Sequence, residues 1–277
     1  MNPNIARRQA TNVVMTSITA VCAFFTVFIL FIVLGYIAWR GLSSINLEFL
    51  IDTPKPVGEG GGISNAIVGT LLLLLLASVI GLPIGICAGV YLAEFGNNWF
   101  GKAVRFTSDT LTGVPSIVAG IFAYVVIVLP TGHFSAYSGG VALALIMIPI
   151  VTRTTEEMIR LVPHNLREGA LALGAPHWRV TVGIILPAAA SGIATGAMLA
   201  VARVSGETAP LLFTAFGYRF LSFRLDRPIA SLTQQIFNYA ISPYDDWHAK
   251  AWAATLILIS TILFINIVVR FVTRKRF

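Results

Sequence analysis

Six apolar stretches separated by polar segments are the feature that most restricts the fold of this 277-residue chain. They are residues 17–39, 66–93, 111–130, 139–152, 184–213 and 251–272. A helix that crosses a bilayer needs about 20 mostly apolar residues, because its backbone polar groups must be satisfied internally once water is excluded. Charged residues make up only 11% of the chain, against about 25% in soluble domains. The sequence therefore predicts an all-α integral membrane protein with six transmembrane helices.

Individual residues within or beside these stretches add detail to the predicted helices. Glycines and a proline interrupt the second stretch, which predicts a kinked or closely packed helix. Ser108 and Asp109 stand just before the third stretch, where either residue is suited to cap the start of a helix. Glu94 closes the second stretch and is expected to be a solvated charge at the membrane boundary.

The distribution of basic residues predicts the topology. Six spans place both ends of the chain on one side of the membrane, and that side carries twelve lysines and arginines against six on the other, with Arg203 inside a span. Because basic residues concentrate on the cytoplasmic side, both termini and the polar loop 153–182 are expected in the cytoplasm. The chain then divides into a cytoplasmic segment 1–16, a permease domain 17–272 and a basic cytoplasmic tail 273–277.

One polar loop carries a spaced motif. Glu168, Gly169 and Ala170 are followed by Gly174, and then by an Ile-x-Leu-Pro run that ends at Pro187. Gly174 is suited to turn the chain with a positive φ, and Pro187 is suited to the first turn of a following helix. Between them, the run from Pro176 to Arg179 forms a basic, amphipathic patch that is able to pack on a partner.

This motif resembles the EAA loop of ABC importer permeases, apart from Gly169, which stands where alanine is usual. The resemblance implies the architecture of type I importer permeases. It also implies that residues of about 153–187 form a coupling loop that lies on a cytoplasmic ATPase.

Two opposite charges lie in the fifth apolar stretch. Arg203 and Glu207 are four residues apart and would share one face of a helix. Charges inside a membrane usually face a bundle interior or water, so the pair predicts a polar cavity, or else an ion pair that only locks helix packing. Gly206 and Pro210 flank Glu207 and favour an interrupted helix, as in transporter sites. Arg153 either snorkels to the interface or lines the inner mouth of a pathway.

A closer resemblance extends over almost the whole chain from about residue 20. The sequence is similar to phosphate-specific ABC permeases of the PstA type in the runs that begin at Glu59, Gly89, Val114, Arg153 and Arg203. The resemblance implies a multi-pass subunit of a bacterial inner (plasma) membrane importer of inorganic phosphate, with a substrate pathway that includes Arg203, Glu207 and Arg153.

The implied partners are a second permease (PstC type), a cytoplasmic ATPase dimer (PstB type), an extracytoplasmic phosphate-binding protein (PstS type) and membrane lipid. The resemblance implies no cofactor in this chain, since ATP and magnesium would be bound by the ATPase, and the chain itself would not be an enzyme. The formal charge of +7 marks the cytoplasmic side and not a nucleic-acid partner.

Three alternatives stay open. A permease for another oxyanion, such as sulfate or molybdate, would share the motif spacing. An ATP-independent carrier would leave the loop around Glu168 without a role. A membrane-embedded enzyme would need a nucleophile with its base, or metal ligands, within the spans, and the sequence contains no such grouping.

Overall fold

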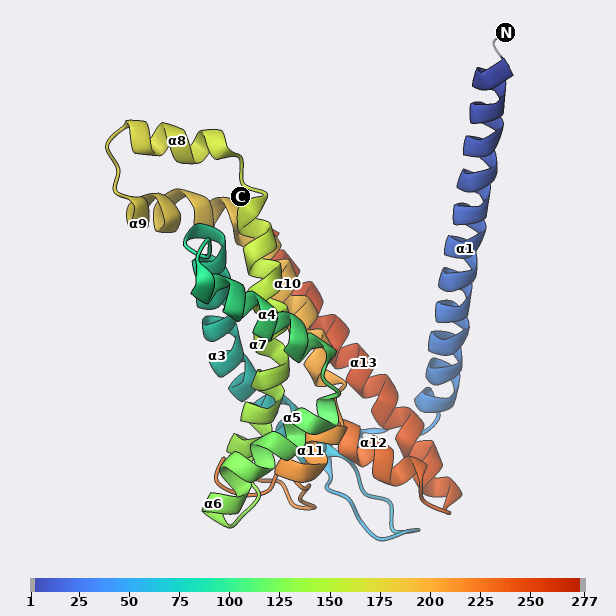
Figure 1. Ribbon diagram of the computed structural model, residues 1–277. Helices are drawn as coiled ribbons and strands as arrows, with labels where there is room; N and C mark the ends of the chain where they lie inside the picture. The colour runs from blue at the N-terminus through green and yellow to red at the C-terminus, as the bar shows by residue number, and fades with distance from the viewer. Residues whose placement is uncertain (1–2, 275–277) are drawn as a thin grey trace.

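The computed structural model describes residues 3–274 and consists of helices joined by loops (Figure 1). In chain order, the first helices are α1 (Pro3–Leu42), α2 (Leu47–Ile51), α3 (Ser64–Glu94), α4 (Trp99–Gly113), α5 (Ser116–Ala123), the π-helical turn η1 (Tyr124–Val128) and α6 (Leu129–Thr131). The helices that follow are α7 (Ala136–Arg160), α8 (His164–Ala172), α9 (His177–Val180), the π-helical turn η2 (Thr181–Ile185), α10 (Leu186–Ser205), α11 (Ala209–Thr214), α12 (Leu232–Ala240) and α13 (Asp245–Arg274). Of the predicted tail 273–277, residues 275–277 lie outside the described part.

Five of the described helices are long and apolar enough to cross a membrane, and a bent pair brings the number to six when it is counted as one span. The five are Arg7–Leu42, Ser64–Glu94, Ala136–Arg160, His177–Ser205 and Asp245–Phe271. The bent pair is Trp99–Gly113 with Ser116–Thr131, whose axes differ by 107°. Six crossings agree with the number predicted from the apolar stretches.

The third span is not the single helix predicted over 111–130. Val114 and Pro115 are extended, with ψ values of 132° and 136°, and they separate α4 from α5. A residue that precedes proline is pushed out of the helical region by the proline ring, so the break follows from the local sequence. The expectation that Ser108 or Asp109 caps this helix is wrong, because both lie inside α4, whose N-cap is Asn98.

Two other helices depart from the predicted bounds. The fourth span, predicted as 139–152, is α7, which continues through Arg153 to Arg160, so the predicted polar loop begins as a helix. The fifth span, predicted as 184–213, ends at Ser205. Hydropathy misplaced the end of the fourth span because a helix in a bundle extends as far as its polar residues find partners. It misplaced the end of the fifth span because Gly206 and Pro210 interrupt a stretch that is still apolar.

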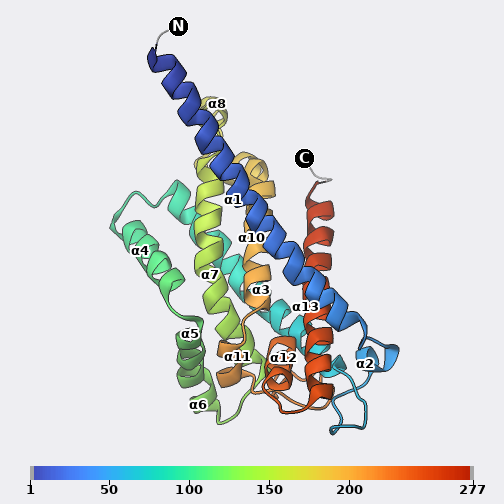
Figure 2. The same ribbon diagram turned by 90° about the vertical axis from the view of Figure 1, so that its right-hand side faces the viewer.

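The helices form a bundle with one outlying member (Figures 1 and 2). α3, α7 and α10 lie together at the centre, whereas α1 stands apart and reaches α13 near its own C-terminal end. There, the ring of Tyr36 meets that of Trp252 edge-on at 5.2 Å, and Gly41 lies against the backbone of Trp252. From Val13 to Val33, α1 exposes its large apolar side chains.

The two ends of the bundle differ in character. The start of α1 and the end of α13 lie at the same end as α8 and α9, and α2, α6, α11 and α12 lie at the opposite end (Figures 1 and 2). We call these the coupling end and the outer end, after the coupling loop and the sides of the membrane that the sequence predicts. The arrangement agrees with the prediction that both termini lie on the same side as the loop around Glu168.

Close packing of α3 on α7 builds the centre. Glycines four residues apart on α3 face residues four apart on α7: Gly81 faces Met147, Gly85 faces Val151 and Gly89 faces Thr155. A Cβ atom on Gly85 would lie 2.7 Å from that of Val151. Small residues at this spacing let two helix backbones approach closely, which is how packing stabilises helix pairs in a membrane.

Both π-helical turns precede a Leu-Pro pair. The Leu129 N–H donates to the Tyr124 carbonyl ahead of Pro130, and the Leu186 N–H donates to the Thr181 carbonyl ahead of Pro187. Proline lacks an N–H and its ring collides with the carbonyl four residues earlier, and a wider turn removes both conflicts. Pro187 thus lies in the first turn of α10, as predicted, but that helix continues directly from η2 and α9.

We predict that Gly85→Ala lowers the free energy of unfolding of the purified chain by about 1–3 kcal/mol, the usual effect of overpacking a closely packed contact. Gly35→Ala is the control, because a Cβ atom at Gly35 meets nothing within 4 Å. Thermal unfolding in detergent measures both variants. Equal stability of the two would show that the α3–α7 contact is looser than the structure has it.

Candidate functional site

The break between α10 and α11 places the two intramembrane charges. α10 ends at Ser205, Gly206 is its C-cap, and Pro210 lies in the first turn of α11. The N–H of Glu207 still donates to the Val204 carbonyl, over 3.2 Å. The interruption predicted from Gly206 and Pro210 is present. The expectation that Arg203 and Glu207 share a face of one helix is wrong, because Glu207 lies beyond its end.

Arg203 and Glu207 nevertheless face each other loosely. Their closest atoms, Arg203 Nη2 and Glu207 Oε1, are 3.8 Å apart, which is too long for a hydrogen bond. The Arg203 side chain is 59% exposed and that of Glu207 is 16% exposed. The Glu207 carbonyl accepts a hydrogen bond from the Thr233 hydroxyl at the start of α12. The backbone of Glu207 is therefore fixed, and the fork of Arg203 remains able to bind another anion.

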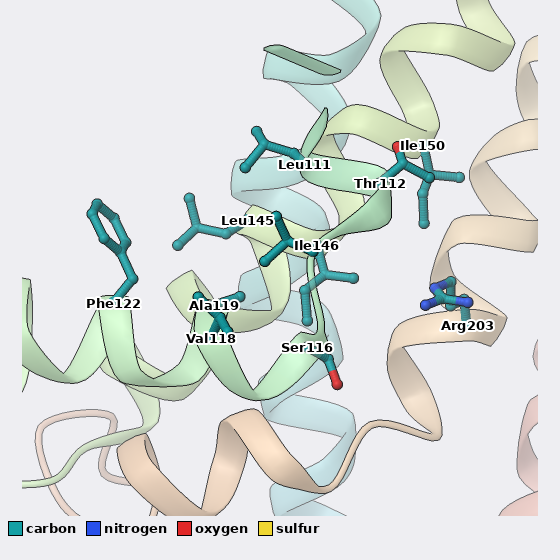
Figure 3. A pocket seen from close by; sticks show the side chains of 11 residues that line it. Leu111, Thr112, Ser116, Val118, Ala119, Phe122, Leu145, Ile146, Ile150 and Arg203 are labelled. Carbon is teal, nitrogen blue, oxygen red and sulfur yellow. The ribbon is translucent and has the colours of Figure 1, made fainter. Parts of the chain in front are cut away.

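Arg203 borders a hollow of about 370 Å³. Figure 3 shows its guanidinium projecting from α10 toward side chains of α4, α5 and α7. The other lining residues are apolar apart from two hydroxyl groups, and they are Leu111, Thr112, Val114, Ser116, Val118, Ala119, Phe122, Leu145, Ile146 and Ile150. Apolar walls reduce screening, so a charge here acts more strongly on an anion than it would in water.

The break in the third span shapes this hollow, because α4 and α5 contribute its walls from either side of Val114 and Pro115. α5 also crosses α11 closely, since a Cβ atom on Gly120 would lie 2.5 Å from the Cα of Pro210. Two interrupted helices thus meet beside Arg203, the arrangement from which transporter sites are commonly built.

A buried carboxylate gathers three arginines nearer the coupling end. Glu156 on α7 has a side chain only 1% exposed. Its oxygens lie 2.7 Å from Arg105 Nε, 3.1 Å from Arg153 Nη1 and 2.6 Å from Arg160 Nη2. We call this set the Glu156 cluster. Sequence reasoning missed it, although an Arg-x-x-Glu-x-x-x-Arg spacing places all three α7 residues within reach on one helix.

Arg105 extends the Glu156 cluster to α3. Its two terminal nitrogens donate to the carbonyls of Leu92 and Gly96 at 2.7 and 2.8 Å. Leu92 lies in the last turn of α3, where its carbonyl has no partner within the helix, and Gly96 follows just beyond the end of that helix. One side chain of α4 therefore joins α3 to α7.

Arg153, predicted as a pathway residue, belongs to the Glu156 cluster and does not line the hollow. Its Nε atom also lies 2.9 Å from Asp109 Oδ1 on α4. Two carboxylates therefore compensate its charge. The prediction that Arg153 borders the inner mouth of a pathway stays a prediction.

The motif around Glu168 forms a short helix with a defined stop. α8 carries Glu168, Gly169 and Ala170, and Gly174 follows with φ of 79°. The N–H of Ala175 donates to the Ala170 carbonyl and that of Gly174 to the Leu171 carbonyl, at 3.3 and 2.9 Å. This is a Schellman motif, which requires a left-handed residue after the helix. The positive φ predicted for Gly174 is confirmed.

An ion pair joins α8 to α3. Arg167 Nη2 lies 2.5 Å from Glu94 Oε1, and the Glu94 side chain is only 10% exposed. The expectation that Glu94 is a solvated charge is wrong, because the tertiary fold brings Arg167 over the last residue of α3. The residue before Glu168 thus fastens the motif to the bundle.

The outer surface of this region remains uncovered. Leu173 is 90% exposed and Trp178 is 61% exposed, and the guanidinium of Arg179 lies 5.4 Å from the centre of the Trp178 ring. The basic, amphipathic patch predicted between Gly174 and Pro187 is therefore present. An exposed apolar patch rimmed by charge is suited to contact a partner.

The sequence of the chain matches a known protein family. Residues 81–277 match the family described as "Binding-protein-dependent transport system inner membrane component". The chain belongs to this family. It is thus an inner-membrane component of a transport system that depends on a binding protein, and its relatives are transport subunits.

Relatives cover nearly the whole chain. It is 44% identical to the "Phosphate transport system permease protein PstA" of Yersinia pestis, over 98% of this chain and 92% of that protein. The protein of the same name from Pasteurella multocida is also 44% identical, over 97% and 96% of the two chains. The Mycobacterium tuberculosis protein "PstA 1" is 36% identical, over 99% and 93%.

A solved structure shares the fold. A chain of the MetNI methionine ABC transporter in an inward-facing conformation superposes with a TM-score of 0.60, at 19% identity, over 78% of this chain and 94% of that one. This similarity confirms the predicted type I ABC importer architecture.

We predict that Gly174→Val frays the last turn of α8, because a β-branched residue at positive φ costs about 1–2 kcal/mol. Gly174→Asn is the control, since asparagine tolerates this conformation and a Cβ atom at this position meets nothing within 4 Å. Hydrogen–deuterium exchange of residues 171–175 should be faster in the valine variant and near normal in the asparagine variant. Equal exchange would contradict the role of φ.

We also predict that Glu94→Gln detaches α8 from α3, because it leaves the partly buried Arg167 without its counter-charge. Loss of a charge-assisted bond should speed amide exchange in α8 about tenfold or more. The reversed pair, Glu94→Arg with Arg167→Glu, should restore part of the protection. Glu157→Gln is the control, since Glu157 is exposed on α7 with no ion pair among the described residues. Unchanged exchange in Glu94→Gln would refute the link.

Proposed function

We propose that this chain is a permease subunit of an ATP-driven importer of inorganic phosphate. The observation that supports this most directly is the exposed guanidinium of Arg203, held in an apolar hollow between two interrupted helices. Relatives named as phosphate transport permeases, at 44% identity over nearly the whole chain, support the same substrate.

Arg203 is the group that would contact the anion. Its planar guanidinium can donate two parallel hydrogen bonds to neighbouring oxygens of a phosphate, a geometry that lysine lacks. The 3.8 Å separation from Glu207 leaves these donors unsatisfied by that carboxylate. Phosphate can therefore bind without first breaking a strong internal hydrogen bond.

Glu207 would regulate the same site. Near neutral pH, inorganic phosphate still carries a proton, so a carboxylate can accept a hydrogen bond from its P–O–H group, whereas sulfate has no proton to offer. When the anion leaves, Glu207 remains as the nearest counter-charge of Arg203. Both effects keep binding transient, as passage through a membrane requires.

Conformational coupling would begin at α8. We propose that a cytoplasmic ATPase dimer, which binds the ATP and magnesium, contacts Glu168 and the exposed patch around Leu173 and Trp178. A displacement of α8 would reach α3 through Arg167 and Glu94, and would reach α10 through the continuous helix from α9. α10 carries Arg203, so the hollow would change shape as the ATPase closes.

Two further partners belong to the proposal. A second permease would complete the pathway, since most of α1 and the hollow beside Arg203 remain uncovered, and a phosphate-binding protein would deliver the anion to the outer end. We also propose that both termini are cytoplasmic, because the coupling end carries most of the basic residues.

A permease for sulfate or molybdate is the second candidate, since Arg203 alone would accept any tetrahedral oxyanion. Glu207 favours phosphate, because a carboxylate repels a fully deprotonated dianion that cannot donate to it. Competition of radiolabelled phosphate uptake by sulfate distinguishes the two candidates.

We predict that Arg203→Gln reduces phosphate uptake at least about tenfold, because it removes charge-assisted hydrogen bonds to the anion, and that Arg203→Lys retains part of it. The double variant Arg203→Gln with Glu207→Gln should assemble but still fail to transport. Uptake of radiolabelled phosphate, normalised to assembled complex, measures each variant. Arg227→Gln, in an exposed outer loop, is the control for loss of an arginine. Full uptake by the double variant would show that the pair serves only packing.

A further inference from the structure

A second pocket opens at the outer end of the bundle. Its volume is about 610 Å³, and three separate segments line it: the loop 54–57, the residues after α11, and the helices α12 and α13. We call it the outer pocket. The residues that line it are Pro54, Lys55, Pro56, Val57, Phe216, Gly217, Tyr218, Arg219, Gln235, Asn238, Tyr239, Tyr244 and Trp247.

Arg219 is the uncompensated charge of the outer pocket. The pocket is lined by no carboxylate, and no ion pair of Arg219 occurs among the described residues. Lys55, the other cation, lies 2.6 Å from Asp52 and 3.4 Å from Glu48. The pocket therefore presents one free guanidinium, the side chain best suited to bind an oxyanion.

Neutral polar side chains line the same pocket. The indole Nε1 of Trp247 is buried without a hydrogen-bond partner among the described residues, an arrangement that native proteins generally avoid unless a ligand or water completes it. Gln235 and Asn238 present amide groups from one face of α12. Burial raises the pKa of the Tyr239 hydroxyl, so this group stays protonated at neutral pH.

The backbone that carries Arg219 is held in an unusual conformation. Phe216 has φ of 61°, the only positive value among the described non-glycine residues, and its ring stacks on Phe134 at 4.5 Å. The carbonyl of Tyr218 accepts a 2.6 Å hydrogen bond from Asn65 on α3. A bulky residue at positive φ is strained, and such strain concentrates at functional sites.

α12 links the outer pocket to the inner site. Gln235, Asn238 and Tyr239 line the pocket from this helix, and Thr233 on its first turn donates to the Glu207 carbonyl. An anion in the outer pocket would thus lie one short helix away from the segment that carries Glu207.

We propose that the outer pocket is an entry-side site for the transported oxyanion, in which Arg219 supplies the charge and Trp247 a neutral donor. The inference rests on the proposed import of phosphate. The anion would bind here after release at the outer end and then pass to Arg203. Successive weak sites let an ion advance without being held too tightly at any one of them.

The test is protection of individual arginines from phenylglyoxal, a reagent that modifies guanidinium groups. The assembled permease complex, without a binding protein, is treated with and without inorganic phosphate at matched ionic strength, and each modified peptide is quantified by mass spectrometry. Phosphate should slow the modification of Arg219 several-fold. Arg224 is the internal control, because it lies in the same loop, pairs with Asp226 at 2.9 Å and does not line the pocket.

A second variant tests the neutral donor. Trp247→Phe keeps an aromatic ring and removes the indole N–H, so half-protection of Arg219 should need about fivefold more phosphate, as expected for the loss of one neutral hydrogen bond. Unchanged protection in this variant would remove Trp247 from the site.

The outcomes separate this inference from the proposed function. Protection of Arg203 without protection of Arg219 overturns the outer site alone, and the reverse overturns the role of Arg203. Equal protection of Arg219 and Arg224 shows a general salt effect and also overturns the outer site. Protection of Arg219 that requires an added binding protein would make the pocket a protein contact, contrary to the proposal.

Discussion

The buried carboxylate of Glu156 is the constraint on which the arrangement of the helices depends. A carboxylate that is 1% exposed must be compensated, and compensation here comes from α4 as well as from its own helix. Arg105 can reach Glu156 only if α4 lies alongside α7, and the same guanidinium then satisfies the free carbonyls at the end of α3. The break at Val114 and Pro115 is local in origin, but this contact holds α4 in place, and α4 forms part of the wall of the hollow beside Arg203.

Two sets of contacts connect the coupling end firmly to the bundle. Glu94 and Arg167 tie α8 to α3, and the close glycine contacts tie α3 to α7. Because packed helices have few alternative arrangements, a force on α8 would move these elements together. The break after Ser205 interrupts this continuity beside Arg203. A change in the position of α10 relative to α11 would therefore alter the hollow without unfolding a helix.

Six of the arginines fall into two groups by how completely carboxylates compensate their charge. Arg105, Arg153, Arg160 and Arg167 each have a carboxylate oxygen within 3.1 Å, as expected of charges that hold helices together. Arg203 has one at 3.8 Å, and Arg219 has no ion pair among the described residues. Both of these line hollows. Incomplete compensation is costly for a structural charge but is a requirement for one that must bind and release an anion.

The sequence by itself determined the class of fold, the number of crossings and the interruption at Gly206 and Pro210, because length, hydropathy and backbone restrictions are local properties. It also located the motif around Gly174, whose positive φ needs only the absence of a side chain. Only the tertiary structure decided that Glu94 is paired, that Asp109 lies within α4 and that Arg153 belongs to the Glu156 cluster. Each of these depends on a partner distant in the chain or on the register of a helix. The energy of a charge in a membrane is set by its neighbours in space, and sequence spacing reveals those neighbours only when they share one helix.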